Sequence, residues 1–164
     1  MLMNCDTANK RVKQLSLERS KLLAQEREAS TYSYLHGEEP YVPEYDFATT
    51  QKKLDELAVE TATIKHAVNV FNSTTVSPIT GLTVDAMLVR MPMLHAQKEK
   101  LGRMRAVMEK SRRMTMNAKA SEYTVRNYSA EDAEAEYQRV SDELTILQQE
   151  LNRINLTEQF EVAI

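Results

Sequence analysis

Apolar residues recur along this chain in steps of three and four, the spacing that places side chains on one face of an α-helix. The pattern is clearest over 129–157, where Ser129 is a good N-cap and acids at 131 and 132 occupy the first turn, which the helix dipole favours. The spacing predicts one long helix here that packs through a heptad face. The stripe consists of Ala133, Tyr137, Val140, Leu144, Leu147, Leu151 and Ile154.

Two earlier segments carry the same periodicity with different clarity. Over about 6–34, a first segment shares a seam of small and apolar residues, but Arg19 and Glu26 interrupt it. A second segment begins after Asp46, the expected N-cap, and is the more regular of the two. Both patterns predict helices. The seam of the second segment is Phe47, Thr50, Leu54, Leu57, Thr61, Ile64, Val68 and Phe71.

A third segment runs from about Thr83 to Lys119 and contains two residues that disturb helices. Pro92 removes one backbone hydrogen bond and should kink the helix, and Gly102 weakens it. The chain otherwise has few residues of this kind, with Gly 3 and Pro 4 among 164 residues. We therefore predict one mainly α domain over 1–164, built as a four-segment antiparallel helical bundle or coiled coil.

Two of the connections between these segments suggest a small β element. The sequences STYSYL (30–35) and SEYTVR (121–126) both alternate as half-buried strands do. In an up-down-up-down bundle the first and third connections lie at the same end. We therefore predict that 30–35 pairs with 121–126 as a two-stranded ribbon capping that end, which also collects six of the seven tyrosines.

This tyrosine-rich end is the best candidate for a binding surface, because tyrosine is enriched at interfaces. The alternative is that the rings only close the end of the bundle. The residues of the candidate ligand or partner surface are Tyr34, His36, Glu38, Glu39, Tyr123, Arg126 and Tyr128.

A second candidate is the polar group in IKHAVNVFN (64–72), where His66, Asn69 and Asn72 fall on one side of the predicted helix. One interpretation makes His66 a base or ligand that the amides orient. We prefer the other, in which the three form a polar helix edge that bonds to a neighbouring helix, with Asn72 placed to end its own.

The charge of the chain gives little support for a nucleic-acid partner. The formal charge is −3 and the pI about 5.7, whereas nucleic-acid binding usually shows as a basic excess. The basic run KSRRMTMNAK (110–119) admits an anion or nucleic-acid site as an alternative. We interpret it as the C-terminal end of the third helix, where cations offset the helix dipole, and predict no nucleic-acid partner.

Other classes of site also lack sequence signals. The histidines are 30 and 29 residues apart and no nucleophile motif is present, so we predict no metal, cofactor or catalytic residue. No apolar run approaches the roughly 20 residues that cross a bilayer, so no membrane partner is predicted. Cys5 is alone and no secretory signal is visible, which together fit a reducing cytoplasm.

Several segments follow one another in an order that resembles the septicolysin-like family of small bacterial proteins. The likeness extends from about residue 10 to 160. Its most specific marks are the GEEP loop (37–40), the N-x-x-N with following threonines (69–75) and the segment from NY to NL (127–156). The resemblance implies a helical bacterial protein of unknown role, and the family name suggests membrane lysis.

These observations favour a non-enzymatic structural or interaction protein that self-associates into a homo-oligomer through heptad faces. Four thin helices have much surface for their core, which favours pairing between subunits. An alternative is a small-ligand-binding protein or enzyme with its site at the tyrosine-rich end. Membrane lysis is a remote alternative, because the polar helix faces mix acids and bases whereas membrane-active helices usually carry Lys/Arg-rich faces.

Overall fold

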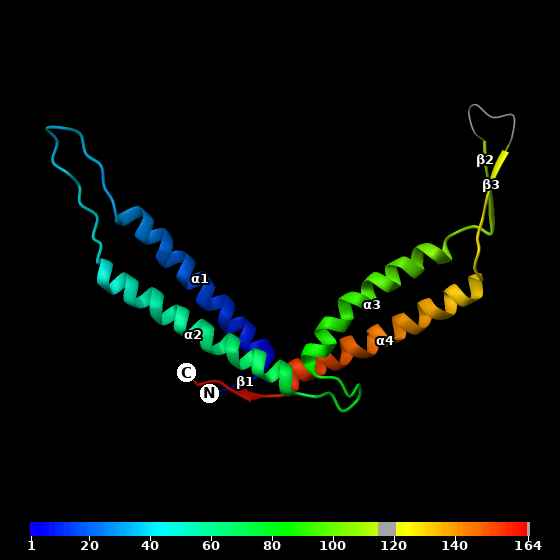
Figure 1. Ribbon diagram of the computed structural model, residues 1–164. Coiled ribbons are helices and arrows are strands. Elements are labelled where there is room, and N and C mark those ends of the chain that lie inside the picture. Colours follow the sequence, from blue (N-terminus) through cyan, green and yellow to red (C-terminus); the bar gives the residue numbers. More distant parts are fainter. Residues whose placement is uncertain (115–120, 164) are drawn as a thin grey trace. The chain divides into compact units, whose positions relative to one another are not determined.

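The computed structural model describes residues 1–114 and 121–163, and this part of the chain is mainly helical (Figure 1). The prediction of four helices with a small two-stranded ribbon is confirmed for the described residues. The chain divides into two compact units: unit 1 (Met1–Thr74 with Arg153–Ile164) and unit 2 (Thr75–Asn152). The elements in order are β1 (Leu2–Met3), α1 (Cys5–Ala29), α2 (Phe47–Thr74), α3 (Val84–Arg105), β2 (Lys110–Met114), β3 (Ser121–Val125), α4 (Ala130–Thr157) and β4 (Phe160–Glu161).

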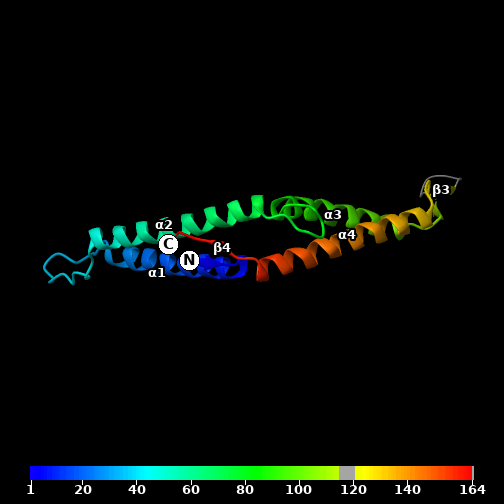
Figure 2. The same cartoon turned by 90° about the horizontal axis from the view of Figure 1, so that it is seen from below.

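Unit 1 is built on α1 and α2, which lie side by side and antiparallel (Figures 1 and 2). Arg11 of α1 pairs with Glu60 of α2 at 2.7 Å, and nearer the connection Gln51 donates to Glu26 at 2.6 Å. The short strands β1 and β4 pair antiparallel beside this helix pair. The buried core of the unit is Met3, Ala8, Leu15, Ile64 and Val162, with Val12, Leu57, Ala67, Val68 and Phe160 packed against it.

Local capping explains where the helices of unit 1 begin. Asn4 accepts a hydrogen bond from the backbone N–H of Thr7 at 2.8 Å, and the Thr7 hydroxyl accepts from the Asn4 N–H in return. At α2 the expected cap is confirmed, because the Asp46 carboxylate accepts from the backbone N–H of Thr49 at 3.1 Å and from its hydroxyl at 2.7 Å. These hydrogen bonds hold the pKa of Asp46 below its usual value.

Unit 2 is built on α3 and α4, which are also antiparallel (Figure 1). Arg90 pairs with Glu143, and toward the other end of α3 Arg105 pairs with Glu134 at 2.5 Å. Helix α4 begins after Ser129, whose hydroxyl accepts from the backbone N–H of residue 132 at 3.3 Å, so the predicted cap is confirmed. All members of the predicted heptad stripe on α4 are buried except the second, Tyr137, which is half-buried.

The third helix is shorter than predicted, because α3 ends at Arg105 and not near Lys119. A side chain from the connection to α4 bonds to its last turn: the Tyr128 hydroxyl donates to the Met104 carbonyl at 2.7 Å. Within the basic run 110–119, residues 110–114 form strand β2 and the rest lie outside the described residues. The interpretation of that run as a helix end is therefore wrong for 110–114.

The predicted ribbon exists with a different partner strand. β3 pairs antiparallel with β2, so that Arg112 is opposite Tyr123 and Lys110 is opposite Val125. The segment 30–35 forms no strand and belongs to the connection between α1 and α2. The pairing of neighbouring segments closes a short loop, whereas pairing with 30–35 would close a loop of about half the chain, 36–120, at a higher entropy cost.

Tyr137 lies against the turn of α3 that contains Gly102. The Arg105 guanidinium carbon is 4.0 Å from the centroid of this ring, and the Lys98 ammonium is 5.5 Å from it. A Cβ on Gly102 would stand 3.7 Å from Cε2 of Tyr137, which is an ordinary van der Waals distance. Alanine therefore fits at this position.

Gly102→Ala should raise the free energy of unfolding by about 0.5–1 kcal/mol, because glycine in a helix interior loses the most backbone freedom on folding. Gly81→Ala is the matched control. The φ of Gly81 is +68°, which strains an L-residue, so this change should lower the free energy of unfolding by about 1 kcal/mol. Urea unfolding followed by circular dichroism measures both. A similar loss of stability in the two variants would contradict the packing described at Gly102.

Candidate interaction surfaces

The residues predicted for the tyrosine-rich surface fall in different units. Tyr34, His36, Glu38 and Glu39 belong to the α1–α2 connection of unit 1, and all four are exposed. The rings of this connection stack locally, with the centroids of Tyr32 and Tyr34 6.3 Å apart. The remaining three predicted residues belong to unit 2, so a joint surface of the two groups stays a prediction.

In unit 2, two of the three predicted residues make packing contacts. Tyr128 bonds to the end of α3 as described above, and Arg126 donates from Nε to the Tyr128 carbonyl at 3.1 Å and from Nη1 to the Val107 carbonyl at 3.2 Å. These bonds tie the β3–α4 segment to the end of α3. Tyr123 differs, because this residue stays 53% exposed on the ribbon, with the Lys110 ammonium 4.6 Å from the centroid of its ring.

The predicted polar cluster lies on the C-terminal half of α2. His66 and Asn69 are exposed and Asn72 is half-buried, and the helix continues two residues past it to Thr74. His66 borders a pocket of about 380 Å³ between α2 and the C-terminal segment. The floor of this pocket is aromatic, with the rings of Phe71 and Phe160 4.8 Å apart.

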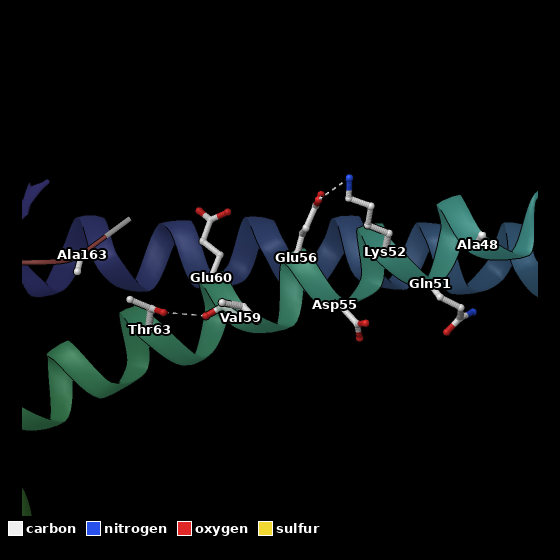
Figure 3. Close-up of a pocket in the computed structure, with 9 residues that line it drawn as sticks. All are labelled: Ala48, Gln51, Lys52, Asp55, Glu56, Val59, Glu60, Thr63 and Ala163. Atoms are coloured by element: carbon white, nitrogen blue, oxygen red, sulfur yellow. Dashed lines mark hydrogen bonds and ion pairs between the residues drawn. The ribbon is translucent and has the colours of Figure 1, made fainter.

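A longer shallow groove follows the exposed side of α2 (Figure 3). Its volume is about 790 Å³, and Thr63 and Ala163 line both this groove and the pocket beside His66. In Figure 3, Gln51 and Asp55 point to one side of the helix, and a second row of charged side chains points to the other. The residues that line the groove are Ala48, Gln51, Lys52, Asp55, Glu56, Val59, Glu60, Thr63 and Ala163.

The exposed side of α2 has coiled-coil spacing that the sequence analysis did not identify. Positions along it advance in unbroken steps of four and three, and every one of them is exposed, including Val59 at 65%. The signal was present in the sequence, but the more apolar seam that faces α1 concealed it. We call this set the α2 outer stripe: Ala48, Lys52, Asp55, Val59, Ala62, His66, Asn69 and Ser73.

Unit 2 contains a buried polar contact that the sequence analysis also missed. Ser77, in the connection before α3, donates its hydroxyl to Oε1 of Glu150 at 2.9 Å. The same hydroxyl oxygen accepts the backbone N–H groups of Ile79 and Thr80, both at 3.1 Å. Both side chains of the contact are buried, so they anchor the connection to α4 and leave no exposed reactive group.

Residues 1–114 and 121–163 contain neither a metal-binding cluster nor a membrane-spanning helix. No group of three His, Cys, Asp or Glu side chains is placed there to hold a metal ion. No helix in that part of the chain is both long and apolar enough to cross a membrane.

The fold and these surfaces define a mainly helical protein with two small antiparallel sheets. No known protein family matches the sequence, and no curated protein matches it. Among solved structures, the chain is similar to the crystal structure of a functionally unknown conserved protein from Corynebacterium diphtheriae, with a TM-score of 0.60 and 15% identity. The match covers 98% of this chain and 100% of that one, and at this identity it shows the fold alone.

Proposed function

We propose that this protein is a non-enzymatic helical interaction protein that assembles with a second copy of itself, and that the α2 outer stripe is the contact surface. The observation that carries the proposal is the exposure of every member of a stripe with unbroken coiled-coil spacing. The heptad stripe of α4, which first suggested self-association, packs within the chain. The outer stripe of α2 has the same spacing, with Ala48, Val59 and Ala62 as its apolar members, and it remains available to a partner helix.

The stripe is complementary to itself about its midpoint. When two copies of α2 lie antiparallel around a two-fold axis between residues 60 and 61, Val59 faces the partner's Ala62 at the centre. One step further out, Asp55 faces the partner's His66, which brings a carboxylate to an imidazole. Because the axis repeats each contact, this isologous pairing contains two such Asp–His contacts and places no like charges in opposition.

The outer positions favour the same alignment. Lys52 faces the partner's Asn69, whose amide oxygen can accept from the ammonium group. Moving the axis by one step of the stripe would instead place Asp55 against the partner's Val59. That register would cover a carboxylate with methyl groups and leave it without a partner, which costs free energy.

A cytoplasmic location and a bacterial, septicolysin-like origin belong to the same proposal. The single cysteine supports the location, because a reducing compartment needs no disulfide framework. The sequence marks at 37–40, 69–75 and 127–156 support the origin.

Charge reversal on the stripe tests the proposed interface. Asp55→Arg and His66→Glu should each weaken the dimer by about tenfold. The first removes both carboxylates that face the partner's imidazole, and the second places a carboxylate against the partner's Asp55 in two contacts. The double variant, Asp55→Arg with His66→Glu, places a guanidinium against a carboxylate in both contacts and should return the dissociation constant to within about threefold of the parent. Sedimentation equilibrium measures the dissociation constants of the dimers. Glu28→Lys, at an exposed position of α1, is the control for a change in net charge.

The outcomes separate self-association from the choice of surface. A parent chain that stays monomeric at high concentration and low salt would contradict self-association. A parent dimer that both reversals leave unchanged would keep self-association and exclude the α2 outer stripe as its surface.

A further inference from the structure

The ribbon formed by β2 and β3 carries positive charge on a chain that is negative overall. Four cations and two carboxylates lie in 106–114 and 121–128, whereas the whole chain has a formal charge of −3. Because α3 ends at Arg105, the cations of β2 do not serve the end of a helix. They belong to an extended ribbon that leaves the ends of α3 and α4 (Figure 1).

The strand register sorts these charges onto two faces. Residues directly opposite each other in an antiparallel pair point to the same side, and neighbours along a strand alternate. Lys110 and Arg112 therefore share one face with Tyr123 and Val125. Two contacts agree with this: the Lys110 ammonium lies over the Tyr123 ring, and Arg112 Nε donates to Oγ of Ser121 at 2.8 Å.

The carboxylate of the ribbon lies on the opposite face. Glu122 is opposite Arg113 in the register, and both alternate away from Tyr123. The first face therefore combines two cations with a half-exposed aromatic ring and apolar surface from Val125, which is 59% exposed. We call it the basic face of the ribbon: Lys110, Arg112, Tyr123 and Val125.

We propose that the basic face of the ribbon binds single-stranded nucleic acid, with Lys110 and Arg112 on phosphates and Tyr123 stacked on a base. This inference goes beyond self-association and reverses the expectation drawn from the charge of the whole chain. Two residues along a strand advance by about 6.6 Å, so Lys110 and Arg112 start from successive positions of one face and can follow an extended backbone. An exposed aromatic ring beside cations is the arrangement that binds single strands without reading their sequence.

The ring distinguishes this partner from other polyanions. A membrane surface or an acidic protein would use the two cations, but stacking on Tyr123 needs a flat base. Two phosphate contacts on a chain of negative net charge imply weak binding that is sensitive to salt. For a single strand, the logarithm of the binding constant should fall with the logarithm of salt concentration with a slope of about −1.4.

Fluorescence anisotropy of a labelled 20-nucleotide oligothymidine, titrated with the full chain at low salt, tests the proposal. Lys110→Gln with Arg112→Gln should weaken binding roughly 10- to 60-fold at 50 mM salt, because two phosphate contacts are lost. Tyr123→Ala should weaken it roughly tenfold, whereas Tyr123→Phe keeps the stacking ring and should bind like the parent. Arg113→Gln is the matched control from the other face and should change binding by less than about threefold.

Thermal unfolding by circular dichroism shows whether each variant keeps the parental fold. The absence of binding by the parent chain at low salt would overturn the proposal. It would also fail if Tyr123→Ala bound as tightly as the parent, or if Arg113→Gln were as damaging as the Lys110 and Arg112 changes. Equal binding to phosphatidylserine vesicles, with no dependence on Tyr123, would assign the basic face to a membrane surface instead.

Discussion

Ile64→Ala should lower the free energy of unfolding by about 2–5 kcal/mol, because it removes buried methyl and methylene groups and leaves a cavity. Ile64 is fully buried in the core of unit 1, where Leu15 of α1 is packed in the same cluster. In the core of a helix pair, few other side chains can shift to fill this cavity. Unfolding in urea, followed by circular dichroism, measures the change.

Leu17→Ala is the matched control for this prediction. Leu17 is an aliphatic residue on α1 that is 54% exposed, so its truncation should change the free energy of unfolding by about 0.5 kcal/mol or less. If the two variants were equally stable, Ile64 would not belong to the core described here.

Ser77→Ala should cost about 2–4 kcal/mol, a large effect for the loss of one oxygen atom. The buried hydroxyl donates to Glu150 and accepts two backbone N–H groups, from Ile79 and Thr80. Alanine removes all three hydrogen bonds at once, and buried polar groups that lose their partners keep their desolvation cost. Thermal and urea unfolding report the loss.

Ser20→Ala is the control, since the Ser20 hydroxyl donates to the carbonyl of Ser16 on the exposed side of α1. That change should remain within about 0.5 kcal/mol of the parent. Glu150→Gln supplies a second test, because it keeps the shape of the side chain and an oxygen that can accept from Ser77. It should therefore cost less than Ser77→Ala, and the reverse order would contradict the hydrogen-bond assignment.

The sequence was a good guide where the determinants of structure are local. The boundaries of α4 follow from the Ser129 cap and the unbroken stripe after it, and α2 begins after the cap at Asp46. In both cases a side chain bonds to a backbone group three residues away. Such signals need no knowledge of the rest of the fold.

The errors arise where distant contacts decide. Residues after Arg105 include good helix formers, so composition alone extends the third helix too far. The helix ends where two distant side chains bond to its last turn and the residues after it. The Tyr128 hydroxyl donates to the Met104 carbonyl, and Arg126 donates to the Val107 carbonyl. A strand was predicted at 121–126 and is observed at Ser121–Val125, but its partner depended on a topology that the periodicity of the helices does not determine.

The candidate surfaces were predictable to different degrees. His66 and Asn69 were singled out from the sequence, but their place on an exposed stripe required knowing which face of α2 packs on α1. The contact between Ser77 and Glu150 joins positions 73 residues apart, and nothing in the local pattern pairs them. The basic face of the ribbon was not predicted, because the third helix was expected to include Lys110 and Arg112, which belong to strand β2.

The pairing of β1 with β4 has a consequence for the order in which the chain can fold during synthesis. Ile64 and Leu15 are made before unit 2, but Val162, which completes their cluster, is made after it. Unit 2 is continuous in sequence and is translated in full before unit 1 has all its parts. Nascent α1 and α2 therefore have an incomplete core while unit 2 is made. During this interval their exposed apolar surface is available for chaperones to bind.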